Sequence, residues 1–198
     1  MKKIILLVAL ALFSFRSKDA LIVHRLIVLP QSQLTISGKT NVNEFACIIA
    51  KYSGSDTLVL HEGKTRPVFV QGALQLDASG FDCGMALMTS DFRKAINSRQ
   101  YPAITIDFIS FEKMPAYSEQ REMFKGIIKI TISGVTRLFE VMCDIRATPS
   151  CIIELRGKRD FTFADFELQP PTRMLGAVKV DKRLTVDFHL ELQLDPNL

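Results

Sequence analysis

The sequence predicts an all-β protein, an antiparallel sandwich or barrel, on three observations. Apolar and polar residues alternate in short runs from about residue 30 onward, clusters of turn residues separate these runs, and helical periodicity is clear in one short segment. Successive side chains of a strand point to opposite faces, so a period of two gives each strand one buried face and one wet face. Many short strands separated by turns favour an antiparallel sandwich or barrel.

The N-terminal residues 1–19 are predicted to be an export signal. Two lysines follow Met1, an apolar run covers residues 4–15, and charged residues interrupt it at 16–19. This order is typical of a secretory signal peptide, and the run is shorter than the roughly 20 residues that a spanning helix needs. The alternatives are an uncleaved anchor or a buried first strand. We expect a signal at 1–19 with an undefined cleavage site, one domain at 20–198, and a periplasmic or extracellular protein.

The strands are expected at runs of alternating residues that are distributed along the whole domain. The longest run, Leu184–Leu194, alternates without a fault. The earlier runs, in chain order, are Leu34/Ile36, Phe45–Ile49, Leu74/Leu76, Ile104–Phe108, Ile128–Ile132, Phe139–Ile145, Ile153/Leu155 and Phe161/Phe163. One short helix is expected near 90–97, with Thr89 or Ser90 as its N-cap, and it ends before Tyr101-Pro102.

Charge and motifs argue against several classes of function. The net charge is +4, but residues 1–19 contribute most of it, so the domain itself is near neutrality and we expect no nucleic-acid partner. Gly38-Lys39-Thr40 resembles the end of a phosphate-binding loop, but Gln33 stands where that loop needs glycine. The three histidines are not spaced as metal ligands, and no C-x-x-C pair occurs. We therefore expect no catalytic residue, no metal and no cofactor.

The four cysteines lie in phase with apolar neighbours, so all four are expected to point inward. An exported protein can form disulfides, and four cysteines allow three connectivities. Cys143 and Cys151 flank a turn at Thr148-Pro149, which suggests the pair Cys143–Cys151, with Cys47–Cys83 as the second pair. Four buried free thiols are the alternative.

Several motifs, in order, resemble the YceI-like family of exported lipid-binding barrels. They are Ser37–Cys47, Phe81–Gly84, Asp91–Ile96 with Tyr101–Ile104, Gly126–Thr136, and Asp165–Thr172 with Gly176–Val180. The resemblance extends from about residue 33 to 194. It implies an eight-stranded antiparallel β-barrel, lipocalin-like, around an apolar cavity that holds an isoprenoid or another lipid-like molecule.

Within such a barrel, the inward strand phase supplies the candidate ligand-binding residues. They are Phe45, Ile104, Ile106, Phe108, Ile128, Ile130, Phe161, Phe163, Phe188 and Leu190. A purely structural core would use the same residues. Of the long loops at 114–122 and 169–175, one is expected to border the cavity mouth, with Arg173 or Lys125 meeting a polar head group.

Three functions follow from this picture, and the first is favoured. The protein is a non-catalytic carrier of an isoprenoid-type lipid, an enzyme that acts on a bound apolar substrate, or an exported interaction module with a filled core and no ligand. The oligomeric state stays open, a homodimer included.

Overall fold

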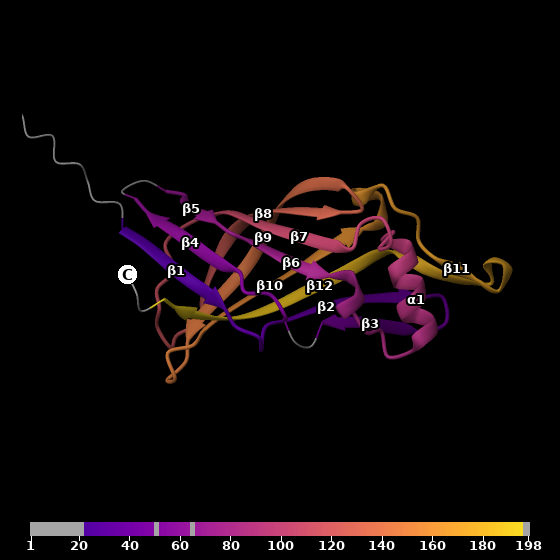
Figure 1. Ribbon diagram of the computed structural model, residues 1–198, viewed down its shortest axis with the longest axis horizontal. Helices are drawn as coiled ribbons and strands as arrows, with labels where there is room; N and C mark the ends of the chain where they lie inside the picture. Colours follow the sequence, from indigo (N-terminus) through magenta and orange to yellow (C-terminus); the bar gives the residue numbers. More distant parts are fainter. Residues whose placement is uncertain (1–21, 50–51, 64–65, 196–198) are drawn as a thin grey trace, which may run out of the picture.

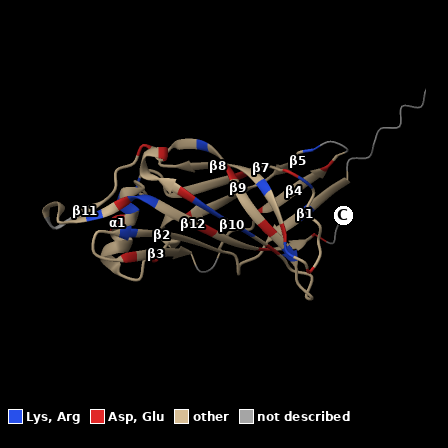
Figure 2. Cartoon of the chain, turned by 180° about the vertical axis from the view of Figure 1, so that it is seen from behind, with Lys and Arg blue, Asp and Glu red and all other residues tan. Residues whose placement is uncertain are grey.

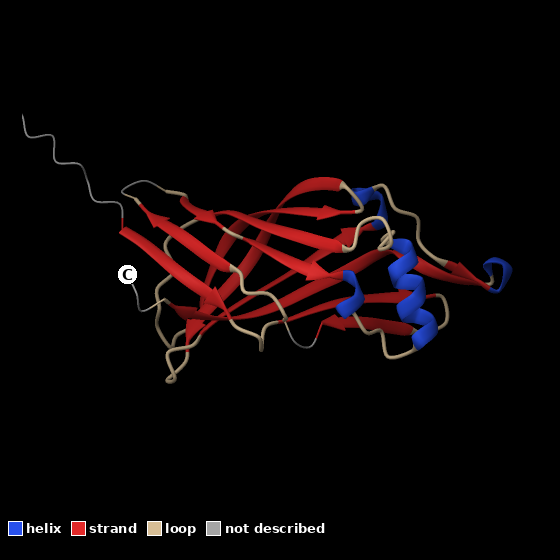
Figure 3. Cartoon of the chain, in the orientation of Figure 1, coloured by secondary structure: helices blue, strands red, loops and turns tan. Residues whose placement is uncertain are grey.

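A computed structural model describes residues 22–49, 52–63 and 66–195, so the predicted export signal lies outside the described residues. Most of this chain is strand, and the helical segments gather at one end of the molecule (Figure 3). The strands are β1 Ile22–Val28, β2 Gln33–Thr40, β3 Glu44–Ile49, β4 Thr57–Glu62, β5 Val68–Gln71, β6 Ala73–Asp77, β7 Ala103–Phe111, β8 Glu122–Ile132, β9 Val135–Ala147, β10 Ile153–Thr162, β11 Thr172–Arg173 and β12 Val178–Leu194. The helical segments are η1 Ala78–Gly80, α1 Ala86–Ala95, η2 Phe163–Phe166 and η3 Met174–Gly176.

Eight strands form a closed antiparallel ring, which confirms the predicted fold class. The order is β1-β4-β5-β7-β8-β9-β10-β12, and β12 returns to β1 where Leu26 lies opposite Leu194 and Val28 opposite Leu192 (Figure 1). Closing a sheet on itself removes the unpaired edges that would otherwise pair with other chains.

Different strands complete the barrel wall at its two ends. β12 is long enough to pair with β1 near its end and with β2 along its first part, and β3 pairs with β2. On the other side, β5 pairs with one end of β7 and β6 with the other end. Near α1 the wall is therefore β6-β7-β8-β9-β10-β12-β2-β3. Between β3 and the segment after β6 there is one bridge, Ile48 with Asp82.

The period-two pattern of the last strand matches its burial. Phe188, Leu190 and Leu192 are buried in the core, and Leu184 and Val186, in the same phase, are half-buried, whereas Leu194 at the strand end is exposed. The β8–β9 hairpin also follows from sequence, because Ser133 and Gly134 have positive φ values of 52° and 79° and join Ile132 to its partner Val135. Such two-residue turns match the twist of the flanking strands.

The predicted helix exists but begins earlier than expected. It spans Ala86–Ala95, its N-cap is Met85, and no side chain caps it. Both expected caps, Thr89 and Ser90, lie inside the helix, where the Thr89 hydroxyl accepts a hydrogen bond of 3.0 Å from the backbone N–H of Cys83. This bond connects the helix to the preceding loop instead of capping it.

The structure contains the disulfide Cys47–Cys83. The other predicted disulfide is wrong, because Cys143 and Cys151 are free and Cys151 is exposed rather than inward. The register explains this result. Ala147 pairs with Ile153, so Cys143 lies opposite Gly157, while Cys151 sits in the turn with a φ of 60°.

Candidate ligand-binding cavity

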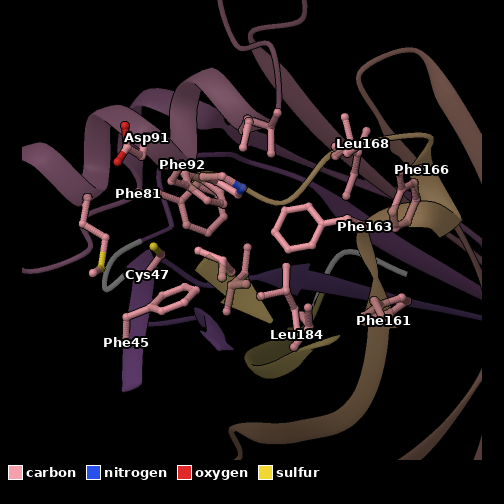
Figure 4. Close-up of a pocket in the computed structure, with 18 of the residues that line it drawn as sticks. Phe45, Cys47, Phe81, Asp91, Phe92, Phe161, Phe163, Phe166, Leu168 and Leu184 are labelled. Atoms are coloured by element: carbon pink, nitrogen blue, oxygen red, sulfur yellow. The ribbon is translucent and has the colours of Figure 1, made fainter. Parts of the chain in front are cut away.

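A cavity of about 380 Å³ lies inside the barrel at the α1 end (Figure 4). Its wall comes from β2, β3, β6, β7, β8, β10, β12, α1 and η2, and nearly all of the lining side chains are apolar. The polar residues in the lining are Thr40, Asn43, Asp91 and Thr162. The size falls in the range of about 300–1,000 Å³ that is usual for small-molecule sites.

Six of the ten predicted ligand-binding residues line this cavity. They are Phe45, Ile104, Ile106, Ile130, Phe161 and Phe163. The other four are buried but do not line it: Phe108, Ile128, Phe188 and Leu190. These four share the inward face but lie further toward the β5 end, where side chains fill the interior. Phe108, for example, packs edge-on against Phe111, with ring centroids 6.3 Å apart.

A glycine in β2 leaves room for two large side chains of the cavity wall. Gly38 on β2 lies opposite Phe45 of β3 and Leu184 of β12. A Cβ at Gly38 would be 2.5 Å from Phe45 Cζ and 2.7 Å from Leu184 Cδ2. Because glycine leaves this space free, both side chains can pack over β2 at the cavity wall (Figure 4). The residue therefore serves packing and not phosphate binding.

One side of the wall is aromatic and is positioned by η2. Thr162 and Asp165 form a capping box at the start of η2, and Phe163 and Phe166 of this turn are both buried at the cavity. Phe161 packs edge-on against Phe139, with ring centroids 4.8 Å apart. Edge-to-face pairs of this kind are favourable beyond their buried area, so this part of the wall is expected to be rigid.

The helix α1 forms the facing side, and strand-based reasoning missed it. Met88, Phe92 and Ala95 line the cavity at spacings of four and three residues, which places them on one face of the helix. Phe92 packs on Phe81, with ring centroids 4.9 Å apart. The spacing of these three residues is a helical signal that the sequence does contain.

The segment that leads into α1 is fastened to the barrel by two kinds of contact. The disulfide and the backbone bonds between Ile48 and Asp82 join it to β3. Arg93 donates from Nη2 to the carbonyl oxygen of Ser79 at 2.6 Å, which ties the helix back to η1. The helix is thus held as a fixed cover over one side of the cavity.

The cavity opens between the start of α1 and the β2–β3 turn. Met85 and Leu87 of α1 and Val42 of the turn line the cavity and are also exposed. Asp91, half-buried on α1, is the one residue with an ionisable side chain among the described lining residues. The opening therefore combines apolar surface with a carboxylate.

The predicted head-group contacts are placed differently by the structure. Lys125 lies on the outer surface, where Glu140 at 3.0 Å raises the pKa of its ammonium group, so its predicted role is wrong. The prediction that the loop at 114–122 borders the cavity mouth is also wrong, because Tyr117 of this loop packs against His24 of β1, at the barrel end opposite α1. The loop at 169–175 does reach the cavity through Pro171, whereas the Arg173 side chain lies outside the described residues.

Within residues 22–49, 52–63 and 66–195, no group of three or more His, Cys, Asp or Glu side chains could hold a metal ion. No helix in the same ranges has the length and apolar character to cross a membrane.

Comparison with known proteins identifies the fold. No family model and no curated protein matches the sequence. Several solved structures do resemble it. A polyisoprenoid binding domain from Saccharophagus degradans implicated in plant cell wall breakdown has a TM-score of 0.61 at 11% identity, over 88% of this chain and 99% of that one. Burkholderia cenocepacia BcnA has a TM-score of 0.57 at 17% identity, over 81% of this chain and 95% of that one.

A Campylobacter jejuni YCEI protein is a more distant match, with a TM-score of 0.49 at 12% identity over 80% of this chain and 85% of that one. The matches with TM-scores of 0.61 and 0.57 show that this chain shares its overall fold with solved proteins despite low identity. The chain has the YceI-like fold that its ordered motifs resemble.

Proposed function

We propose that this protein is a non-catalytic carrier that holds one isoprenoid-type lipid, or a similar amphiphile, in the cavity at the α1 end. The observation that carries the proposal is the apolar interior space of about 380 Å³ with an opening beside α1. The similarity to a structure described as a polyisoprenoid binding domain supports the choice of ligand class.

The energetics of the cavity favour an occupant. The apolar side chains around the cavity lack protein contacts on their inner side, and such missing contacts are unfavourable. An apolar chain in the cavity restores the lost contacts and buries its own surface at roughly 25 cal/mol per Å².

The polar lining groups support binding rather than catalysis. Thr40 donates from Oγ1 to Asn43 Oδ1 at 2.6 Å, and Thr162 caps η2, so these groups serve local structure. Asp91 lies half-buried on the helix side of the opening. An arrangement of this kind suits a polar head group at the mouth and an apolar tail inside, and it contains no nucleophile paired with a base among the described lining residues.

Lipid extraction and native mass spectrometry of the purified protein test this function, together with titration of dansyl-labelled undecanoic acid. Ala95→Leu fills the cavity from α1, and Ala86→Leu makes the same change on an exposed position of that helix. We expect Ala95→Leu to weaken probe binding about tenfold or more, because its three extra carbons occupy space that carbons of the ligand would otherwise fill. Ala86→Leu should bind the probe normally. A wild-type protein that carries no lipid and binds no probe would overturn the proposal.

Export is a separate part of the same proposal. A carrier that meets lipid in the cell envelope needs the predicted signal at residues 1–19 to be removed during secretion. N-terminal sequencing of the protein from a periplasmic or culture fraction should find a start near residue 20. A mature protein that retains its first 15 residues would contradict export by a cleaved signal.

A further inference from the structure

Exposed apolar side chains surround the cavity mouth. Val42, Met85 and Leu87 all line the cavity, yet each is more than half exposed. Scattered apolar residues are ordinary on a protein surface, but a group of them around one opening marks an interaction site. The group joins two separate elements, the β2–β3 turn and the first turn of α1.

A projecting hairpin extends the same surface. β11 pairs with the start of β12, and η3 forms the tip, where Leu175 is fully exposed and has a φ of 57°. The hairpin reaches beyond α1 in both views (Figures 1 and 2), while Pro171 and Val178 at its base line the cavity. An apolar residue at such a tip has no core to contact, so it is available to a partner.

The side chain of Asn41 in the β2–β3 turn is hydrogen-bonded to the backbone of the hairpin. Asn41 donates from Nδ2 to the carbonyl oxygen of Ala177 at 2.9 Å and accepts at Oδ1 from the N–H of Lys179 at 2.9 Å. Val42, the residue after Asn41, is therefore fixed beside the hairpin base. We call Val42, Met85, Leu87 and Leu175 the rim.

Basic side chains lie directly behind the rim. Lys179, Lys182 and Arg183 on β12 are exposed. Asp181 lies in the same stretch, and Arg183 Nη1 is 3.6 Å from Asp160 Oδ2. Lys179 and Lys182 are therefore the basic residues on which the docking surface depends. Figure 2 shows blue residues, with red ones among them, near the base of the hairpin. This arrangement fits the surface of an anionic bilayer. The projecting apolar side chains would contact acyl chains, and the basic side chains behind them would contact anionic head groups.

We propose that the rim docks on an anionic lipid bilayer, with the cavity mouth facing the membrane. This inference rests on the proposed function, because an isoprenoid is insoluble in water and must enter the cavity from a membrane. Docking lets the apolar tail pass from the acyl chains to the cavity without entering water. Exposing that tail to water would cost about 25 cal/mol per Å² of its apolar surface. Leu175 and Val42 enter the interface, and Lys179 and Lys182 contact the head groups.

Co-sedimentation with vesicles of equal parts phosphatidylcholine and phosphatidylglycerol tests the docking. Leu175→Asp is the test variant, since Leu175 does not line the cavity, and Phe69→Asp on β5 is the control, a 62% exposed side chain at the opposite end. We expect Leu175→Asp to weaken vesicle binding about tenfold or more. Lys182→Gln should weaken it about fivefold, and Phe69→Asp should leave it unchanged.

Three results would overturn the docking surface. They are equal vesicle binding by wild type and Leu175→Asp, equal loss in Phe69→Asp, and a wild-type dimer that Leu175→Asp converts to a monomer in light scattering. The last result would assign the rim to a second copy of the chain. Titration of the dansyl probe without vesicles keeps the two proposals apart, because Leu175→Asp should bind it like wild type, whereas failure of wild type to bind it refutes the cavity function itself.

Discussion

Breaking the Cys47–Cys83 disulfide is expected to lower the free energy of unfolding by about 4 kcal/mol. The two cysteines are 36 residues apart in sequence. In the chain-entropy treatment the crosslink removes about 2.1 + 1.5R ln n cal/mol/K from the unfolded state, roughly 13 cal/mol/K here, which is about 4 kcal/mol at 25 °C. For a domain of this size, each kcal/mol shifts Tm by about 2–4 °C, so the loss amounts to about 8–16 °C.

Guanidinium unfolding measures this effect with its own control. Wild type in a phosphine reductant and the double variant Cys47→Ala/Cys83→Ala should both unfold at a lower midpoint than oxidised wild type. The reductant should not change the double variant. A double variant that unfolds at the midpoint of oxidised wild type would refute the reasoning.

Thiol counting checks the same bond independently. The unfolded, non-reduced protein should offer two thiols to alkylation, Cys143 and Cys151. In the native protein Cys151 should react first, because burial, assisted by the Asp144 charge, raises the pKa of the Cys143 thiol to about 12 and hides it from reagent. Four reactive thiols in the unfolded protein would show that the disulfide is absent.

Two further predictions concern the barrel wall. Gly157→Val should destabilise the protein by about 1–3 kcal/mol or more in thermal unfolding, because a Cβ there overlaps the Phe188 ring, whereas Gly80→Ala, with open space around its Cβ, should be nearly neutral. Glu154→Gln should cost about 2 kcal/mol at pH 7, since Arg146 at 2.8 Å lowers the pKa of this carboxyl group. That stability is present above the unfolded pKa and is lost as the pH falls through the lower, folded pKa, so the urea midpoints of wild type and variant should converge in strong acid. Midpoints that stay equally far apart at low pH would contradict it.

Much of the fold could be predicted because its determinants are local. The alternation of Leu184–Leu194 identifies a strand with one wet face, and Ser133-Gly134 identifies a tight hairpin. The failures have a common cause, since they depend on pairing between distant residues. Cys151 alternates correctly with Ile153, but the register of β9 with β10 places it in the turn.

The site was harder to predict than the fold. Period two shows which face of a strand is inward, but it does not show how deep along the barrel a residue lies. Phe188 and Leu184 occupy the same phase of β12, yet Phe188 is core and Leu184 lines the cavity. Composition does not separate them, because a packed interior and an apolar cavity both require large apolar side chains.

The difference between the two ends comes from what closes the ring. At the β5 end neighbouring strands complete the wall, with a spacing of about 4.8 Å, and an eight-stranded ring is then narrow enough to be filled by its own side chains. At the other end β3 and β6 form no ladder, and α1 lies beside β3 (Figure 1). A helix about 10 Å across widens the interior where it replaces a strand in the wall. The cavity is therefore a consequence of the helical segment between β6 and β7, and the disulfide at Cys83 holds that segment in the position that keeps the cavity open.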